Sequence, residues 1–155
     1  MPDFNIDFFT VNISAPRFPR KSTRDWLSKT IRKENKNTTC IEINFIFCDD
    51  NYLLSLNYDF LKKETLTDVI TFDYSEKKSI KGDVFISVER VKENAVKYHQ
   101  KKQDELFRVM VHGVLHLLGY NDITEKEKIK MTEREDFYLS KLGDIIHKKN
   151  DRKHA

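Results

Sequence analysis

The chain places its strand-like segments mostly first and its long helical segments last, and this order most constrains the fold. Alternating or β-branched residues predict four strands, at residues 4–13, 40–48, 68–74 and 83–88. Helical spacing of apolar residues predicts a helix that begins near Ser22, a short one at 52–58, and longer ones at 89–100, 104–118 and 124–142. The order favours an α+β fold, in which a mixed four-stranded sheet is packed with about five helices.

Local motifs refine these elements. Ser22-x-x-Asp25 resembles a helix start and Thr124-x-x-Glu127 a capping box, so a helix is predicted to begin at each of them. A polar turn at residues 75–79 predicts that the strands on either side of it are antiparallel neighbours. In the strand at 40–48, alternation predicts that four apolar side chains face one way: Ile41, Ile43, Phe45 and Phe47.

The size and composition predict one domain without a membrane anchor. The 155 residues suit a single domain at 1–145, followed by a basic C-terminal tail at 146–155. The chain has neither an apolar run of the roughly 18 residues that a membrane helix needs nor the pattern of a signal peptide. Cys40 and Cys48 lie roughly 26 Å apart if they share one straight strand, so they cannot pair there. Free cysteines suit a reducing compartment, and we expect a monomer in the cytoplasm.

The basic residues are unevenly placed. The net charge of +3 is too small to identify a polyanionic partner. Residues 16–33, however, hold one acid, Asp25, against seven cations: Arg17, Arg20, Lys21, Arg24, Lys29, Arg32 and Lys33. Such a stretch is typical of a phosphate-binding surface or of an ordinary solvated helix face, and both interpretations stay open.

The segment VMVHGVLHLLGYND, residues 109–122, carries the candidate chemistry. His112 and His116 are four residues apart on an apolar helix, so both rings project from one face and can reach one metal ion. Gly119 can end the helix in the left-handed conformation, and the chain can then bring Asp122 back toward the two histidines. Three protein ligands leave a fourth position for water, which is typical of a catalytic zinc site, here at the end of a central helix.

This segment also permits interpretations other than a zinc hydrolase site. The two histidines can instead be buried and hydrogen-bonded within a core, and two histidines with a carboxylate also suit non-haem iron. Zinc peptidases of the HExxH type place their general base directly after the first histidine, where this chain has Gly113. This difference counts against proteolysis. Gly113 also permits a neighbouring strand or a substrate to approach the helix closely.

The same segment resembles a known family. HGVLHLLGYND is similar to the H-G-x-L-H-L-x-G-Y-D-H signature of the YbeY endoribonucleases, the ribosomal RNA maturation factors. Weaker similarities follow in the family's order, at Leu56-Asn57, 67–72, 81–87, Glu105-Leu106, and Met131 with Glu135. The resemblance therefore covers roughly residues 50–140.

The resemblance implies a zinc-dependent endoribonuclease that is selective for single strands. It implies a role in small-subunit (16S) ribosomal RNA maturation and in ribosome quality control, with ribosomal RNA and the small ribosomal subunit as partners. It also implies a mixed four-stranded sheet beside the metal helix. One zinc ion per chain is expected on His112, His116 and Asp122, and the two histidines are expected to be catalytic.

Two positions depart from the family pattern. Asp122 stands where the family usually has a third histidine. Aspartate is a competent zinc ligand, but its charge makes a bound water less acidic and can favour harder metals. Leu61 stands where the family commonly has an arginine that is suited to hold phosphate. Lys62 and Lys63 are candidates to replace it, and two further candidates for RNA contacts lie in the basic stretch, Arg24 and Arg32.

The remaining candidates are a general base and two charged neighbours of His112. Asp68 is the candidate base because its segment resembles family sequence beside the site, and a turn-capping role at the strand entry is the alternative. Arg108 and Glu105 share the helical face of His112 but lean toward the helix N-terminus, so packing or a salt bridge is predicted for them. Two other functions stay open: a metal-dependent hydrolase of another substrate such as peptide, and a non-enzymatic ribosome assembly factor with a structural metal.

Overall fold

A computed structural model describes residues 3–61 and 67–154, with backbone alone for Leu61 and for residues 143–154. Its four strands are β1 (Asp3–Thr10), β2 (Cys40–Cys48), β3 (Val69–Asp73) and β4 (Ser79–Ser87). They form one sheet in the order β1-β2-β4-β3, in which the first two pairings are parallel and β3 runs antiparallel to β4. The mixed four-stranded sheet is therefore confirmed, as is the antiparallel neighbourhood of the last two strands.

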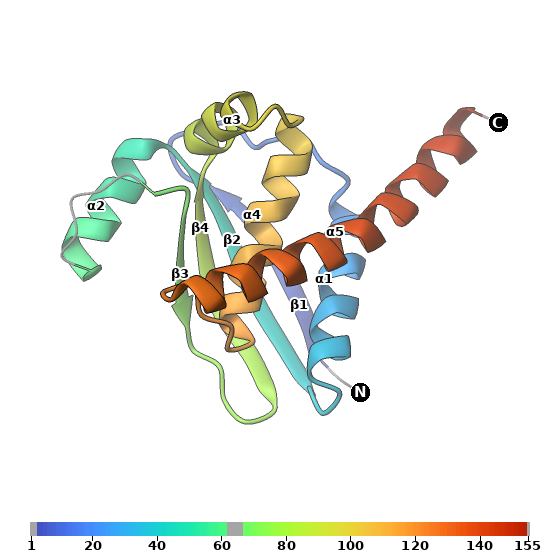
Figure 1. Cartoon of the computed structure of the whole chain (residues 1–155), viewed down its shortest axis with the longest axis horizontal. Helices are drawn as coiled ribbons and strands as arrows, with labels where there is room; N and C mark the ends of the chain where they lie inside the picture. The colour runs from blue at the N-terminus through green and yellow to red at the C-terminus, as the bar shows by residue number, and fades with distance from the viewer. Residues whose placement is uncertain (1–2, 62–66, 155) are drawn as a thin grey trace.

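The helices are α1 (Arg20–Glu34), α2 (Asp50–Leu61), α3 (Val88–Lys97), α4 (Lys102–Leu117) and α5 (Glu125–His154). In Figure 1, α4 lies against one face of the sheet and α5 crosses in front of it, while α2 lies at the β3 end of the sheet. The main core joins that face to α1, α4 and α5, and a smaller core under α2 occupies the other face. An α+β fold with five helices is confirmed.

Alternation in β2 gives the main core its centre. Ile41, Ile43, Phe45 and Phe47 are all buried on the side of the sheet that faces α4, as their spacing predicts. Cys48, the last residue of the strand, belongs instead to the smaller core under α2. Cys40 and Cys48 are both free thiols, and burial together with Asp49 and Asp50 raises the pKa of Cys48 to about 12.

Two helix ends differ from the prediction. The helix start predicted at Ser22 is wrong: α1 begins at Arg20, and its cap is Pro19, whose carbonyl accepts the backbone N–H and the hydroxyl of Thr23. Proline's fixed φ suits the entry to a helix, and Ser22 is then buried inside the first turn. The box at Thr124 is confirmed by reciprocal bonds with Glu127, but α5 continues past Leu142 to His154. The backbone of the predicted tail is therefore helical as far as His154.

Close packing of α4 on the sheet positions the face that carries the histidines. A Cβ atom at Gly113 would lie 2.7 Å from Cγ1 of Val84 in β4, so only glycine allows this approach. Gly113 therefore serves strand–helix packing, which is one of the two roles expected for it. None of the helices in the described ranges combines the length with the apolar composition that a membrane span requires.

Candidate metal centre

The end of α4 determines where the third candidate ligand lies. Gly119 has a φ of 100°, a conformation that glycine adopts without strain. Its N–H donates to the His116 carbonyl at 3.0 Å, and the Tyr120 N–H donates to the Leu115 carbonyl at 3.0 Å. This pair of bonds is the Schellman arrangement, which closes a helix and reverses the chain. The reversal carries Asp122 back over the last turns of α4, as the sequence predicts.

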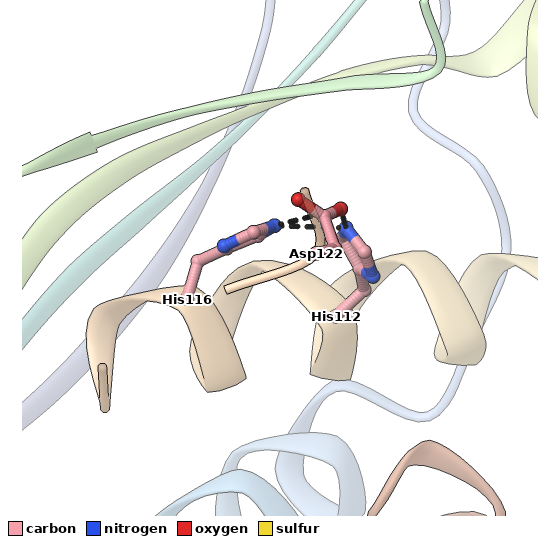
Figure 2. Close-up of side chains that lie close together, drawn as sticks. All are labelled: His112, His116 and Asp122. Atoms are coloured by element: carbon pink, nitrogen blue, oxygen red, sulfur yellow. Dashed lines mark hydrogen bonds and ion pairs between the residues drawn. The ribbon is translucent and has the colours of Figure 1, made fainter. Parts of the chain in front are cut away.

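His112, His116 and Asp122 point toward one another in Figure 2. The two Nε2 atoms are 3.0 Å apart, and each lies 3.3 Å from Oδ2 of Asp122. All three side chains are partly buried, with 21%, 26% and 40% of their surface exposed. The structure thus brings together the three residues that the sequence nominated as ligands.

The spacing of these three atoms fits a metal ion. Ligands placed tetrahedrally at about 2.0–2.2 Å from zinc lie roughly 3.3 Å from one another. Two of the three separations equal that value and the third, between the two Nε2 atoms, is 0.3 Å shorter. Two imidazoles with one carboxylate form a donor set that zinc accepts. The interpretation of His112 and His116 as core histidines bonded to core partners does not account for this convergence.

Glu135 on α5 holds the ring of His112. Its Oε2 lies 2.6 Å from Nδ1 of His112, which leaves Nε2 directed at the cluster. Arg108 donates to the other oxygen of Glu135 at 2.9 Å and to Asp136 at 2.6 Å, so the predicted salt-bridge role of Arg108 is confirmed. A carboxylate behind a ligating histidine fixes its tautomer and raises its basicity. Sequence reasoning noted Glu135 only as a position of the family resemblance, and its role here comes from the structure.

The surroundings shift the pKa values of the two histidines in opposite directions. Burial lowers the pKa of His112, but the hydrogen bond and charge of Glu135, with Asp122 and Asp68, outweigh burial and raise it. Burial and the neighbouring His112 lower the pKa of His116. The two histidines with their neighbouring carboxylates thus favour one positive charge. A bound cation would supply this charge in place of a proton on His112.

The cluster opens into a cavity of about 600 Å³ between α4, β3 and α2. Asp68, at the entry to β3, lines this cavity with Asn57 and Thr71. Burial raises the pKa of Asp68, as do Glu135 and Asp122, against the lowering effect of His112. Thr71 Oγ1 is buried and has no hydrogen-bond partner among the described residues. The cavity therefore offers the carboxylate of Asp68 beside the candidate metal ligands.

A shared carboxylate anchors the loop that carries Asp122. Glu34, the last residue of α1, accepts hydrogen bonds from the hydroxyls of Tyr120 and of Tyr138 on α5, one at each oxygen. Burial and the Glu34 carboxylate raise the pKa of both hydroxyls, so both remain donors. Tyr120 also hydrogen-bonds to His116 through its backbone, and it stands two residues before Asp122. No sequence pattern pointed to this contact, because Glu34 and Tyr120 are 86 residues apart.

The other predicted residues lie away from the cluster or outside the described part. Lys62 and Lys63 fall outside the described residues, and only the backbone of Leu61 is described. Arg24 and Arg32 lie on α1 beside β1, the edge strand opposite β3, so the structure does not bring them to the cavity. Glu105 is buried beside Arg108 and Glu135, and burial raises its pKa. The RNA-binding roles of Lys62, Lys63, Arg24 and Arg32 stay predictions.

The first prediction concerns Glu135. Replacing Glu135→Gln removes the charge behind His112, so zinc affinity should fall by about 10–100-fold. Competition with a chelating dye measures this change. Asp136→Asn is the matched control, because Asp136 is exposed and pairs with Arg108 alone; its zinc affinity should stay within about twofold of the parent. Equal affinities in all three proteins would refute the role given to Glu135.

The second prediction concerns the loop. Tyr120→Phe removes a hydrogen bond to a carboxylate, worth about 1.5–3 kcal/mol, and should weaken zinc binding by about tenfold, because the loop carrying Asp122 loses its anchor. Tyr138→Phe removes the other bond to Glu34 from a helix that bears no ligand. It should lower the free energy of unfolding by a similar amount, measured in urea, and leave zinc affinity unchanged. Zinc affinities that fall alike in both variants would contradict a specific role for Tyr120.

Comparisons with known proteins agree with this site. The sequence model described as "Endoribonuclease YbeY" matches residues 9–143. The chain is 45% identical over 140 residues to endoribonuclease YbeY of Amoebophilus asiaticus, covering 90% of this chain and 94% of that protein. It is 47% identical over 141 residues to that of Cytophaga hutchinsonii, covering 90% and 97%.

A solved structure shares the fold. The solution structure of TM1509 from Thermotoga maritima superimposes with a TM-score of 0.62 at 23% identity, covering 94% of this chain and 93% of that one. The family match spans α4, the loop after it and most of the remaining fold. The resemblance noted in the histidine motif therefore extends over most of the chain, and the chain belongs to the endoribonuclease YbeY family.

Proposed function

We propose that this chain is a zinc-dependent endoribonuclease that cuts single-stranded RNA during small-subunit (16S) ribosomal RNA maturation and in ribosome quality control. The observation that carries the proposal is the convergence of His112, His116 and Asp122 at the mouth of a cavity of about 600 Å³. Family membership supports an enzyme that cleaves RNA phosphodiester bonds in ribosomal RNA processing. We further propose that it acts as a single domain, at 1–145, on the small ribosomal subunit in the cytoplasm.

His112, His116 and Asp122 would hold the metal through Nε2, Nε2 and Oδ2. A bound divalent ion supplies Lewis-acid chemistry, since it acidifies water and neutralises charge on a phosphoryl group. Glu135 keeps Nδ1 of His112 engaged, and the Tyr120 loop keeps Asp122 in place. Asp122 brings a negative charge that a third histidine would not, so this centre is less electrophilic than one with three neutral ligands.

Asp68 is the proposed general base. It lines the cavity with the candidate ligands, and its raised pKa makes its carboxylate a better proton acceptor than that of an exposed aspartate. Asn57 and Thr71 also line this cavity. The turn-capping alternative for Asp68 gains some support from a hydrogen bond with its own backbone.

Positive charge for the phosphate would come from a bound metal ion and from groups beyond the cavity lining. Among the described residues, the lining includes Asp68, Asp73 and Asp122 and no lysine or arginine. Arg108 is already bonded to Glu135 and Asp136. Lys62 and Lys63 remain the candidates for the missing family arginine, on the segment between α2 and β3.

The third prediction tests the activity. Purified protein should cleave an unstructured single-stranded RNA, lose this activity in EDTA, and regain it when zinc is restored. His116→Ala and Asp68→Asn should each lower the rate by at least about 100-fold, and Asp68→Asn should keep its zinc, because Asp68 acts on a proton. Gel analysis of end-labelled RNA measures the rate, and double-stranded RNA and casein are the comparison substrates.

Each alternative function gives a different result. If the protein cleaves casein but not RNA, and EDTA abolishes this cleavage, the chain is a peptide hydrolase and not a nuclease. HExxH peptidases carry their glutamate base directly after the first histidine, and this chain has Gly113 there, which counts against this outcome. If a folded His116→Ala protein supports ribosome maturation as well as the parent does, the chain is an assembly factor whose metal is structural.

A further inference from the structure

Three arginines of α1 follow the free edge of β1. Arg20, Arg24 and Arg32 lie on one helical face because they are four and eight residues apart. Among the described strands, β1 pairs with β2 alone, so its other edge has no neighbouring strand. The guanidinium of Arg20 lies 5.5 Å from the ring centre of Phe8 and 4.9 Å from that of Phe18, Arg24 lies 5.1 Å from Phe8, and Arg32 lies 5.6 Å from Phe4. We call these three arginines, with the exposed Lys21, the α1 strip.

The α1 strip keeps its positive charge available. Within the described ranges, none of its four cations forms an ion pair with an acidic side chain. The first turn of α1 contains no acidic residue. Arg24 donates its Nε–H to the Ile6 carbonyl at 2.8 Å, which leaves its two terminal nitrogens as donors. Aromatic rings hold the planar groups in place, so they are prepared to bind an anion without further ordering.

A hollow adjoins one end of the strip. It has a volume of about 450 Å³ and is lined by Phe8, Phe9, Thr10, Ala15, Arg20 and Phe47. Phe9 is 52% exposed, which is unusual for a phenylalanine. Exposed aromatic rings beside arginines form the platforms on which the bases of single-stranded nucleic acids stack while guanidiniums bind their phosphates. The hollow is therefore suited to one nucleobase.

The two edges of the sheet differ in the charged side chains that lie beside them. The metal cavity beside β3 is lined by carboxylates, whereas the α1 strip lies beside β1 at the other edge. A polyanion that enters the cavity needs cations elsewhere to offset this repulsion. The two places are connected, because α1 ends at Glu34, which bonds to Tyr120 in the loop before Asp122. Arg32 stands two residues before that contact.

We propose that the α1 strip and the adjoining hollow form a second contact surface for single-stranded RNA, separate from the metal cavity. On this surface, the phosphates bind to Arg20, Lys21 and Arg32, and one base stacks on Phe9 in the hollow. The strand then passes the end of α1 and reaches the cavity. The inference rests on the proposed function, since it assigns the same RNA substrate a second point of attachment.

A purely structural explanation makes a different prediction. Charged side chains along a free strand edge also protect it from pairing with another chain. In that case, loss of two arginines would promote association or lower stability, and RNA affinity would follow net charge alone. The test therefore compares variants that remove equal charge from different faces.

Binding of a fluorescein-labelled, unstructured 20-nucleotide RNA is measured by fluorescence anisotropy in EDTA, so that the metal contributes nothing. The variant Arg20→Gln/Arg32→Gln should raise the Kd at least about tenfold and flatten the slope of log affinity against log salt by about 1.4, as expected for two lost contacts. Lys92→Gln/Lys97→Gln on α3 removes the same charge, and one of its lysines also lies over a ring, that of Tyr98. Its Kd should rise less than about threefold, as for charges outside the interface.

Two further variants keep the test independent of stability. Lys21→Glu alters an exposed side chain that touches none of these rings, and it should weaken binding at least as much as one arginine substitution does. Phe9→Ala leaves the charge unchanged and should weaken binding by about 1–3 kcal/mol, or roughly 5–150-fold, if a base stacks there. Equal weakening by the α1 and α3 double variants, or parental affinity in Lys21→Glu and Phe9→Ala, would overturn the proposal.

Cleavage by the zinc-loaded protein separates this proposal from the proposed function. If the parent cleaves RNA and the α1 variants bind and cleave as it does, the second surface is refuted and the nuclease stands. If the parent binds RNA through the α1 strip but cleaves none, the surface stands and the nuclease is refuted. If the chain is a nuclease and also binds RNA through the α1 strip, Arg20→Gln/Arg32→Gln should raise KM for the 20-nucleotide RNA and leave kcat unchanged.

Discussion

The reversal of the chain at Gly119 is the constraint on which the site depends. Without a residue that tolerates a φ of 100°, α4 could not end within one residue and return Asp122 to its own histidines. The reversal brings three ligand atoms within about the separation that a tetrahedral zinc ion imposes. The rest of the fold then fixes the two sides of this arrangement: β4 lies directly under Gly113, and α1 holds Tyr120 through Glu34.

The charges around the two histidines favour a bound cation. Three carboxylates act on His112, from Asp68, Asp122 and Glu135, and Glu105 adds a fourth negative charge close to Asp68 and Glu135. Arg108 offsets part of this charge but is shared between Glu135 and Asp136. Burial raises the pKa of Asp68 and Glu105, as expected for carboxylates that lack enough positive charge nearby. A divalent ion on the three ligands would relieve this repulsion and also attract the phosphate that the acidic cavity alone would repel.

Features that lie within one short segment were predictable from sequence. His112, His116, Gly119 and Asp122 occupy eleven consecutive residues, so helical spacing and one turn suffice to bring them together. Features built from distant segments were not. Glu135 meets His112 from another helix, Glu34 meets Tyr120 across 86 residues, and the strand order β1-β2-β4-β3 follows from packing that no local pattern contains. The start of α1 was misplaced because Pro19, with a fixed φ, set the helix entry in place of the capping serine.

Elemental analysis of purified protein decides whether His112, His116 and Asp122 hold a metal ion. The account predicts close to one zinc ion per chain in the parent protein and in His99→Asn, whose altered residue lies outside the cluster and has a positive φ that asparagine accepts. Asp122→Ala should retain only a small fraction of this zinc after dialysis, because two imidazoles alone bind it weakly. Full zinc occupancy in a folded Asp122→Ala protein, or a parent that binds no divalent metal even when it is supplied, would contradict the account.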